Sequence, residues 1–197
     1  MNPLLLDFPT EFETDRLLIR MPLPGDGAVT CESINHSLHE LKPWMPFAQK
    51  EQTMEDTEIN IRQAYINFLN RTDLRLLVFK KDTGEFVASS GLHRINWDVP
   101  KFEIGYWIDT RFSGKGYMTE AVQGITDFAV RELKARRVEI RCDAMNIKSR
   151  AIPERLGFTL EGILKNESIS VDGDLRDTCV FAKVFSESDK IGPNKQN

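Results

Sequence analysis

One glycine-containing loop, set between an apolar strand-like run and an amphipathic segment, constrains this chain more than any other feature. The run is FEIGYWI (102–108), the loop includes RFSGKG (111–116), and apolar residues then recur at helical spacing from 118 to 133. Gly114 and Gly116 permit backbone angles that other residues rarely adopt. A loop that precedes a helix also directs free N–H groups and the positive end of the helix dipole at one point. This arrangement suits a phosphate group, although an ordinary glycine turn has the same composition.

Two well-known phosphate-binding patterns do not match the loop. A nucleotide P-loop places Ser or Thr after its Gly-Lys pair, but here Lys115 is followed by Gly116. The dinucleotide pattern needs a third Gly or Ala, and it opens a Rossmann unit rather than following the midpoint of a chain. The remaining pattern, R-x-x-G-x-G, is suited to holding a pyrophosphate with successive backbone amides.

The composition favours one domain without a nucleic-acid or membrane partner. At 197 residues, with 41% hydrophobic and 28% charged residues, the chain can bury one sizeable core. A net charge of −4 and a pI near 5.5 argue against a general electrostatic footprint for nucleic acid. Apolar runs fall short of the ~20 residues that cross a bilayer, and the first residues lack the basic region of a signal peptide. We expect a cytoplasmic protein with a single domain over 1–185 and a polar, disordered tail over 186–197.

The cysteines and two of the histidines predict no metal site. Cys31, Cys142 and Cys179 are far apart, which suits a reducing compartment and matches no zinc spacing. His36 and His39 lie three residues apart without further ligands, which predicts a surface pair. Cys142 alternates with charged residues on an apolar strand face, so we interpret it as a core thiol rather than a nucleophile.

The order of the predicted elements follows from hydrophobic periodicity and turn residues. A capping box at Thr53 and Asp56 opens the second helix, and Asp82-Thr83-Gly84 joins two antiparallel strands. The elements are a strand (14–20), a helical stretch to about 39, the loop KPWMPF (42–47), a helix (to 69), strands (74–80, 85–95, 101–108), the glycine loop with its helix, a strand (137–144), a short helix from about 149, and a final strand pair joined through 172–173.

This order and two of its segments resemble the GNAT superfamily of acetyl-CoA-dependent N-acetyltransferases. FEIGYWIDTRFSGKGYMTEAV (102–122) is similar to the acetyl-CoA motif of that superfamily, and NIKSRAIPERLGFTLEG (146–162) is similar to the next helix segment of the Rim-type ribosomal-protein N-terminal acetyltransferases. With TDRLLIR and KPWMPF, the similarity extends over nearly all of 12–185. The resemblance implies an α+β (mixed α/β) fold. In it, a mostly antiparallel sheet of six to seven strands is splayed between strands 4 and 5 and flanked by about four helices.

The resemblance also implies acetyl-CoA as cosubstrate, without a metal. Its pyrophosphate would lie on the glycine loop and its pantetheine arm in the splay, where unpaired strand edges can bind an amide-bearing chain. Asn146 can offer a donor and an acceptor to that arm, or it can close a turn before the helix. The expected cofactor-binding residues are Ile108, Arg111, Phe112, Ser113, Gly114, Lys115, Gly116, Tyr117, Met118, Thr119, Asn146 and Ser149.

Acetyl transfer needs a neutral amine, a donor for the oxyanion and a proton for the departing thiolate. The resemblance implies that Ser149 protonates the sulfur, whereas its local position predicts a helix N-cap. Glu103 is our candidate for the base or for the ligand of the acceptor ammonium group, and its alternative is an ion pair with Lys101 or Arg141. A backbone N–H within 105–108 would face the oxyanion. Trp107 joins Glu103 as an expected substrate-binding residue.

Trp44 lies between prolines in the loop 42–47 and is the third expected substrate-binding residue, its alternative being a cover for the edge of the core. The expected acceptor is the N-terminal α-amine of a protein, possibly ribosomal as the resemblance implies, attacked directly in a ternary complex. An acetyltransferase for a small amine, of polyamine or aminoglycoside type, and a non-catalytic acetyl-CoA sensor stay open, as does a homodimer.

Overall fold

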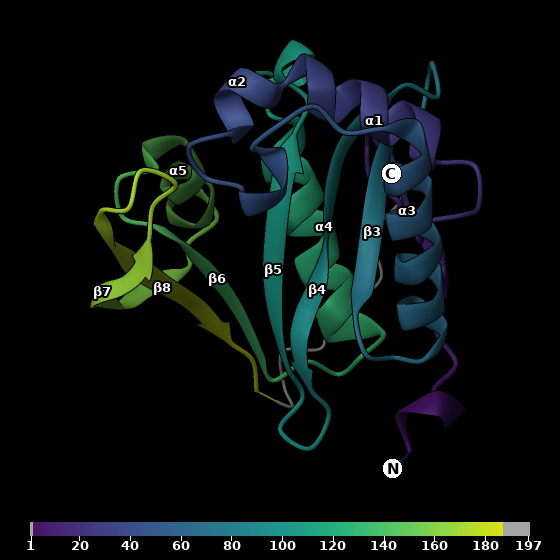
Figure 1. The fold of residues 1–197 in the computed structure, drawn as a ribbon. Coiled ribbons are helices and arrows are strands. Elements are labelled where there is room, and N and C mark those ends of the chain that lie inside the picture. Colours follow the sequence, from purple (N-terminus) through teal and green to yellow (C-terminus); the bar gives the residue numbers. More distant parts are fainter. Residues whose placement is uncertain (1, 187–197) are drawn as a thin grey trace.

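An eight-stranded mixed sheet forms the middle layer of the molecule, with the strand order β1-β2-β3-β4-β5-β6-β8-β7 (Figure 1). The computed structural model describes residues 2–186, so all of the tail expected over 186–197 except Ser186 lies outside the described residues. The strands are β1 (Glu11–Glu13), β2 (Leu17–Arg20), β3 (Leu74–Lys80), β4 (Phe86–Asn96), β5 (Lys101–Ile108), β6 (Arg137–Asp143), β7 (Thr159–Ile169) and β8 (Leu175–Val184).

Helices cover both faces of this sheet. In Figure 1, α3 lies in front of β3 while α4 runs behind β4 and β5, and α5 lies beside β6. Three short 3-10 helices, η1 (Pro3–Leu5), η2 (Pro46–Ala48) and η3 (Thr110–Phe112), lie in connecting segments. The α-helices are α1 (Gly27–His36), α2 (Leu38–Leu41), α3 (Met54–Leu69), α4 (Tyr117–Arg131) and α5 (Ile147–Arg155).

The main core lies between the sheet and α4. Phe102 and Ile104 of β5 pack with Ile125 and Phe128 of α4, and all four side chains are buried. Burying each such side chain contributes about 1.5–3 kcal/mol relative to leaving it exposed, so this layer fixes α4 and the loop before it. Gly124 permits the helix to approach the N-terminal hairpin, because a Cβ there would lie 2.7 Å from Thr14 Cγ2.

The sheet is splayed between β5 and β6, which are the two strands for which the sequence predicts a splay. These strands pair in parallel only from Lys101–Glu103 to Arg137–Glu139. Beyond that point β5 pairs with β4 alone and β6 with β8 alone, and the two strands diverge (Figure 1). The gap therefore has a closed end near Glu103 and opens toward the glycine loop.

The structure confirms the predicted fold class and corrects several of its details. The sheet has eight strands rather than six or seven, because the N-terminal segment forms a hairpin. Residues 14–16, predicted as part of one strand, are its turn, in which the Thr14 N–H donates to the Leu17 carbonyl at 2.9 Å. The described residues contain five α-helices rather than about four, since α2 is a separate turn after Ser37. The predicted N-cap of α3 is confirmed, with the Thr53 side chain accepting from the Asp56 N–H at 3.0 Å.

Candidate active site

The glycine loop ends in a helix N-terminus that no side chain caps. Gly114 and Gly116 have φ of +77° and +81°, and Gly116 is the N-cap of α4. The first intrahelical bond runs from the Glu120 N–H to the Gly116 carbonyl at 3.0 Å. The preceding N–H groups of the first turn therefore have no intrahelical partner and are directed at the loop. This geometry fits an anionic group such as a pyrophosphate.

The Arg111 side chain braces the loop from the side. Its guanidinium contacts the Asp109 carboxylate at 2.6 Å and Glu32 at 2.9 Å, and the Ser33 hydroxyl donates to Asp109 at 2.7 Å. Burial alone would raise the pKa of Asp109, but the hydrogen bonds from Arg111 and Ser33 outweigh it and lower this pKa. A cofactor contact from the Arg111 guanidinium stays a prediction, since that group is held by two carboxylates.

Arg16 braces the loop from the β1–β2 turn, and the sequence alone gives no sign of this. Its guanidinium lies 4.4 Å from the centre of the Tyr117 ring, donates to the Lys115 carbonyl at 3.1 Å and pairs with Glu120 at 2.6 Å. Glu120 also accepts from the Thr14 hydroxyl at 2.6 Å. These contacts connect residues about a hundred positions apart and hold the first turn of α4 against the N-terminal hairpin.

Tyr106 and Ser149 meet across the splay. The Tyr106 hydroxyl donates to the Ser149 backbone carbonyl at 2.8 Å, and the Ser149 hydroxyl lies 3.3 Å from the Tyr106 oxygen. Burial raises the pKa of Tyr106, so its hydroxyl stays protonated at neutral pH. Cys142 lies near them on β6, and burial raises the pKa of its thiol to about 12, as expected for a core thiol.

Asn146, and not Ser149, is the N-cap of α5. The Asn146 side-chain oxygen accepts from the Ser149 N–H at 3.1 Å, so the expectation that Ser149 caps the helix is wrong. Ser149 lies within the first turn, and its hydroxyl is not used for capping. The Asn146 NH2 group has no hydrogen-bond partner in the described part of the chain. Pantetheine binding by Asn146 stays a prediction and would use that donor.

Glu103 lies on the opposite face of β5 from Tyr106, because side chains alternate along a strand. Its side chain is 16% exposed and its carboxylate lies 3.4 Å from the Arg94 guanidinium. The expected alternative partners are wrong, since Lys101 pairs with Glu139 at 3.7 Å and Arg141 with Glu167 at 2.7 Å. Burial raises the pKa of Glu103, and nearby arginines offset only part of this effect. Such a carboxylate can bind a cation or take up a proton.

Two tryptophans flank this face of the sheet. Trp44 is half-buried in the loop before η2, and the Arg176 guanidinium of β8 lies 5.5 Å from the centre of its ring. Trp107 extends from β5, where Phe47 lies 6.2 Å from it between ring centres. The loop 42–47 thus contacts both sides of the splay. We call Glu103, Trp107, Trp44 and Arg176 the acceptor face.

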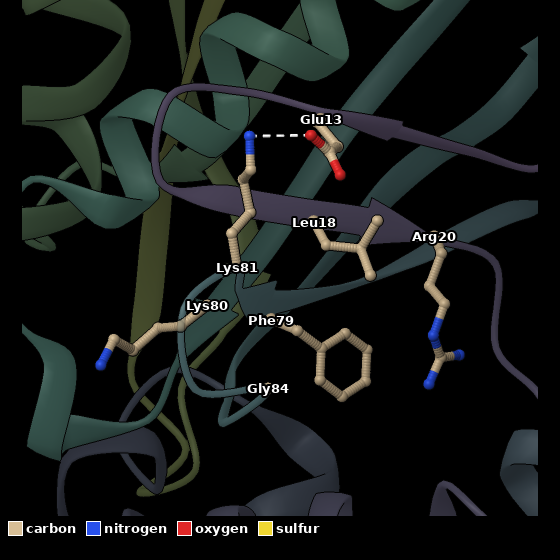
Figure 2. Close-up of a pocket in the computed structure, with 7 residues that line it drawn as sticks. All are labelled: Glu13, Leu18, Arg20, Phe79, Lys80, Lys81 and Gly84. Atoms are coloured by element: carbon tan, nitrogen blue, oxygen red, sulfur yellow. Dashed lines mark ion pairs between the residues drawn. The ribbon is translucent and has the colours of Figure 1, made fainter.

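A separate hollow of about 340 Å³ lies on β2, β3 and the turn after β3 (Figure 2). Figure 2 shows its lysine and arginine side chains around Phe79, with Lys81 paired to Glu13. The charges there are neutralised locally, since Arg20 contacts Asp26 at 2.7 Å and Lys80 contacts Glu85 at 3.0 Å. Because β4 separates β3 from the splayed strands, this hollow is not part of the candidate site.

Residues 2–186 contain neither a cluster of metal ligands nor a helix suited to span a membrane. No group of three or more His, Cys, Asp and Glu side chains is placed there to hold a metal ion. No helix in the same part of the chain combines the length and apolar character that a membrane span requires.

Comparison with known proteins defines the class to which this site belongs. Residues 16–159 match the family described as acetyltransferase (GNAT) domain, and the chain therefore belongs to the GNAT acetyltransferases. Among its relatives, the chain is 34% identical to the putative ribosomal N-acetyltransferase YdaF of Bacillus subtilis (strain 168), over 88% of this chain and 93% of that protein. It is 28% identical to the ribosomal-protein-serine acetyltransferase of Escherichia coli (strain K12), over 72% and 76% of the two chains.

Solved structures share the fold. RimL, a ribosomal L7/L12 alpha-N-protein acetyltransferase in complex with coenzyme A, superposes with a TM-score of 0.81 at 22% identity, covering 90% of this chain and 97% of that one. The microcin C7 self-immunity acetyltransferase MccE in complex with acetyl-CoA and AMP gives a TM-score of 0.81 at 25% identity, covering 90% and 98%. The protein is an acetyl-CoA-dependent acyltransferase, and its uncapped helix N-terminus and splayed strands fit that cosubstrate.

Proposed function

We propose that this enzyme transfers the acetyl group of acetyl-CoA directly to the N-terminal α-amine of a protein, with a ribosomal protein as the first candidate. The observation that supports this most is that candidate catalytic and substrate-binding side chains lie on opposite faces of β5. Tyr106 meets Ser149 on one face, whereas Glu103 lies on the other face with Trp107. A thioester in the gap between β5 and β6 would be reached from both faces. The names of two relatives, which refer to ribosomal acetyltransferases, support the choice of substrate.

The Glu103 carboxylate would bind the acceptor amine. An α-amine titrates near pH ~8, so an appreciable fraction is neutral at pH 7, whereas a lysine near ~10.4 is almost fully protonated. The Glu103 carboxylate is available to bind the ammonium form, since Arg94 contacts it only at 3.4 Å and is mostly exposed. An N-terminus therefore needs less assistance from a base than a lysine side chain does, which favours it as the acceptor.

The thioester would lie in the gap between β5 and β6. Backbone N–H and C=O groups alternate in direction along a strand, so about half of those of residues 104–108 point toward the gap, where β6 no longer pairs with them. One of their N–H groups would stabilise the oxyanion as the amine attacks. The C–S bond then breaks, and the Ser149 hydroxyl donates a proton to the departing sulfur. Tyr106 positions Ser149 by holding its carbonyl group.

The test compares acceptors under the same conditions. Peptides that begin with Ser or Ala, the same peptides with a blocked N-terminus and one internal lysine, spermidine and an aminoglycoside are each incubated with enzyme and acetyl-CoA, and products are identified by mass spectrometry. We expect acetylation of the free N-termini with a kcat/KM at least tenfold above that of the other acceptors. Faster turnover of spermidine or the aminoglycoside would replace this proposal with a small-amine enzyme, and no product from any amine would favour an acetyl-CoA sensor.

Trp44 provides a second test of the acceptor face. The change Trp44→Ala removes the ring beside Arg176 and is expected to raise the peptide KM several-fold while the KM for acetyl-CoA stays within twofold. If only the KM for acetyl-CoA rises, the loop 42–47 serves the cofactor, and the acceptor face is placed wrongly.

A further inference from the structure

A histidine and an aspartate that have no role in the proposed reaction form a pair beside Glu103. His93 of β4 lies directly opposite Glu103 of β5 in the antiparallel register. Side chains at such positions share a face of the sheet and have Cβ atoms about 4.5–5.5 Å apart. The His93 Nδ1 atom contacts the Asp73 carboxylate at 2.6 Å. His93 is therefore on the acceptor face, next to the carboxylate that meets the amine.

The His93 ring occupies the place where Gly105 lacks a side chain. A Cβ built on Gly105 would lie 3.2 Å from His93 Cδ2 and 3.6 Å from Nε2. Gly105 lies between Glu103 and Trp107 on the same face of β5. The Nε2 edge of the ring thus reaches over β5, the strand that borders the splay, between two residues of the acceptor face.

The free edge of the ring is Nε2. The contact with Asp73 selects the tautomer that carries its proton on Nδ1, which leaves the Nε2 lone pair as an acceptor. Nε2 has no hydrogen-bond partner among residues 2–186, and the His93 side chain is 27% exposed. A solvent-accessible imidazole held by a carboxylate is the arrangement in which histidine acts as a base.

We propose that His93, oriented by Asp73, is the base that takes the proton from the acceptor ammonium group held by Glu103. This inference rests on the proposed acceptor face. Proton uptake needs a lone pair within reach of the ammonium group, and Nε2 offers one on the face of the sheet that Glu103 occupies.

The proton balance assigns one proton to His93. The ammonium group gives a proton to His93 Nε2, which passes it to solvent, and the neutral amine forms the N–C bond. As the C–S bond breaks, Ser149 gives its proton to the sulfur, nitrogen loses its second proton to solvent, and Ser149 takes a proton back from solvent. Ammonium and acetyl-CoA thus give the amide, the CoA thiol and one released proton.

Charged groups surround the pair on both neighbouring strands. Asp73 lies just before β3, Arg75 follows on β3 and donates to Asn60 at 2.5 Å, and Arg94 is next to His93 on β4. Glu103 is the charged neighbour on β5. Asp73 contacts the ring and Glu103 lies opposite it, so the pH profile of the enzyme must be read with Asp73 and Glu103 variants as references.

Two substitutions of His93 distinguish a role as base from a purely structural role in holding Asp73. In His93→Asn, the amide nitrogen can replace Nδ1 as donor to Asp73, but no base remains. His93→Ala opens a space that added imidazole can enter. His36→Ala, on the exposed end of α1, is the control. With an N-terminal peptide as acceptor, we expect both His93 variants to lose about 10²-fold in kcat/KM and their acid limb in the pH profile, and imidazole to restore activity to His93→Ala alone.

A structural role would give a different pattern. His93→Asn would then keep the activity and melting temperature of the unaltered enzyme, which would overturn the proposal. The tautomer is checked without any acceptor by 15N NMR of the three imidazoles in the chain, where His93 should carry its proton on Nδ1 and lose this preference in Asp73→Asn. A proton on Nε2 would also overturn the proposal. If the unaltered enzyme acetylates no peptide, the proposed substrate fails instead, and the same variants are assayed with whichever amine is turned over.

Discussion

The Tyr106 hydroxyl donates a hydrogen bond to the Ser149 carbonyl at 2.8 Å, and so joins β5 to the first turn of α5 across the splay. Because the Asn146 side chain already caps α5, the Ser149 hydroxyl takes no part in capping and donates to the Tyr106 oxygen at 3.3 Å. Tyr106 thus positions Ser149, and Asn146 caps the helix. The chemical role of the Ser149 hydroxyl can therefore be tested separately from the stability of α5.

The variant Ser149→Ala should therefore lose activity without losing stability. We expect its free energy of unfolding to stay within about 0.5 kcal/mol, as for substitutions away from structural features, and its kcat to fall about 10²-fold. Asn146→Ala, which removes the cap, should cost about 1 kcal/mol. Thermal unfolding and kcat are measured on the same preparations. A fall in kcat of threefold or less in Ser149→Ala would contradict the acid role.

Substitutions in the glycine loop should weaken acetyl-CoA binding. Gly114 has φ of +77° and open space around its Cβ position, so Gly114→Val meets no neighbour but strains the backbone that presents the N–H groups. Gly84→Val is a matched control, because Gly84 has φ of +71°, open surroundings and a place far from the splay. Calorimetric titration should show at least a tenfold higher Kd for acetyl-CoA in Gly114→Val only. Equal affinities in the two folded variants would show that the loop does not hold the cofactor.

Arg111 should matter for stability more than for the cofactor. The Asp109 side chain is fully buried, and Arg111→Met leaves it without its cationic partner, which costs about 3 kcal/mol. The pKa of Asp109 is lowered in the folded protein, so its contribution is present above the ordinary aspartate pKa and is lost as pH falls through the lowered value. The difference between variant and unaltered enzyme in urea titrations should accordingly shrink in acid. An unchanged stability with weaker acetyl-CoA binding would assign Arg111 to the cofactor.

Glu103→Gln should stabilise the protein at neutral pH and weaken acceptor binding. Because burial raises the pKa of Glu103, ionisation costs stability above that raised pKa and costs nothing below the ordinary value near ~4. The melting temperature of the variant should exceed that of the unaltered enzyme at pH 7, and the gain should vanish near pH 4. We also expect about a tenfold higher acceptor KM, from loss of a charged hydrogen bond, with a smaller change in kcat. A large fall in kcat at constant KM would identify Glu103 as the base instead of His93.

The sequence was sufficient for features that depend on neighbouring residues. The glycine loop, the cap at Thr53 and the strands on either side of the splay follow from local turn chemistry and hydrophobic periodicity, and all are present. The errors are local as well. Residues 14–16 continue an apolar pattern into what is a hairpin turn, and Ser149 resembles an N-cap although Asn146, three residues earlier, takes that role.

Contacts between distant residues could not be predicted in the same way. Tyr106 and Ser149 are separated by 43 positions, and Arg16 and Glu120 by 104. Their contact depends on strand register and on the packing of α4, which no short window of sequence specifies. The pair formed by Asp73 and His93 belongs to this group, since it requires the β3–β4 hairpin and the absence of a side chain at Gly105.

The three residue pairs that connect β5 with β6 have a mechanical consequence. Within residues 2–186 they are the only backbone ladder between a five-stranded part, β1 to β5, and a three-stranded part, β6 to β8. The two parts of the sheet share backbone pairing at one fixed end only. Bending of one part relative to the other therefore widens or narrows the gap without breaking a ladder hydrogen bond. We therefore expect acetyl-CoA to enter and CoA to leave by bending at that fixed end and opening of the Tyr106–Ser149 contact, without rupture of secondary structure.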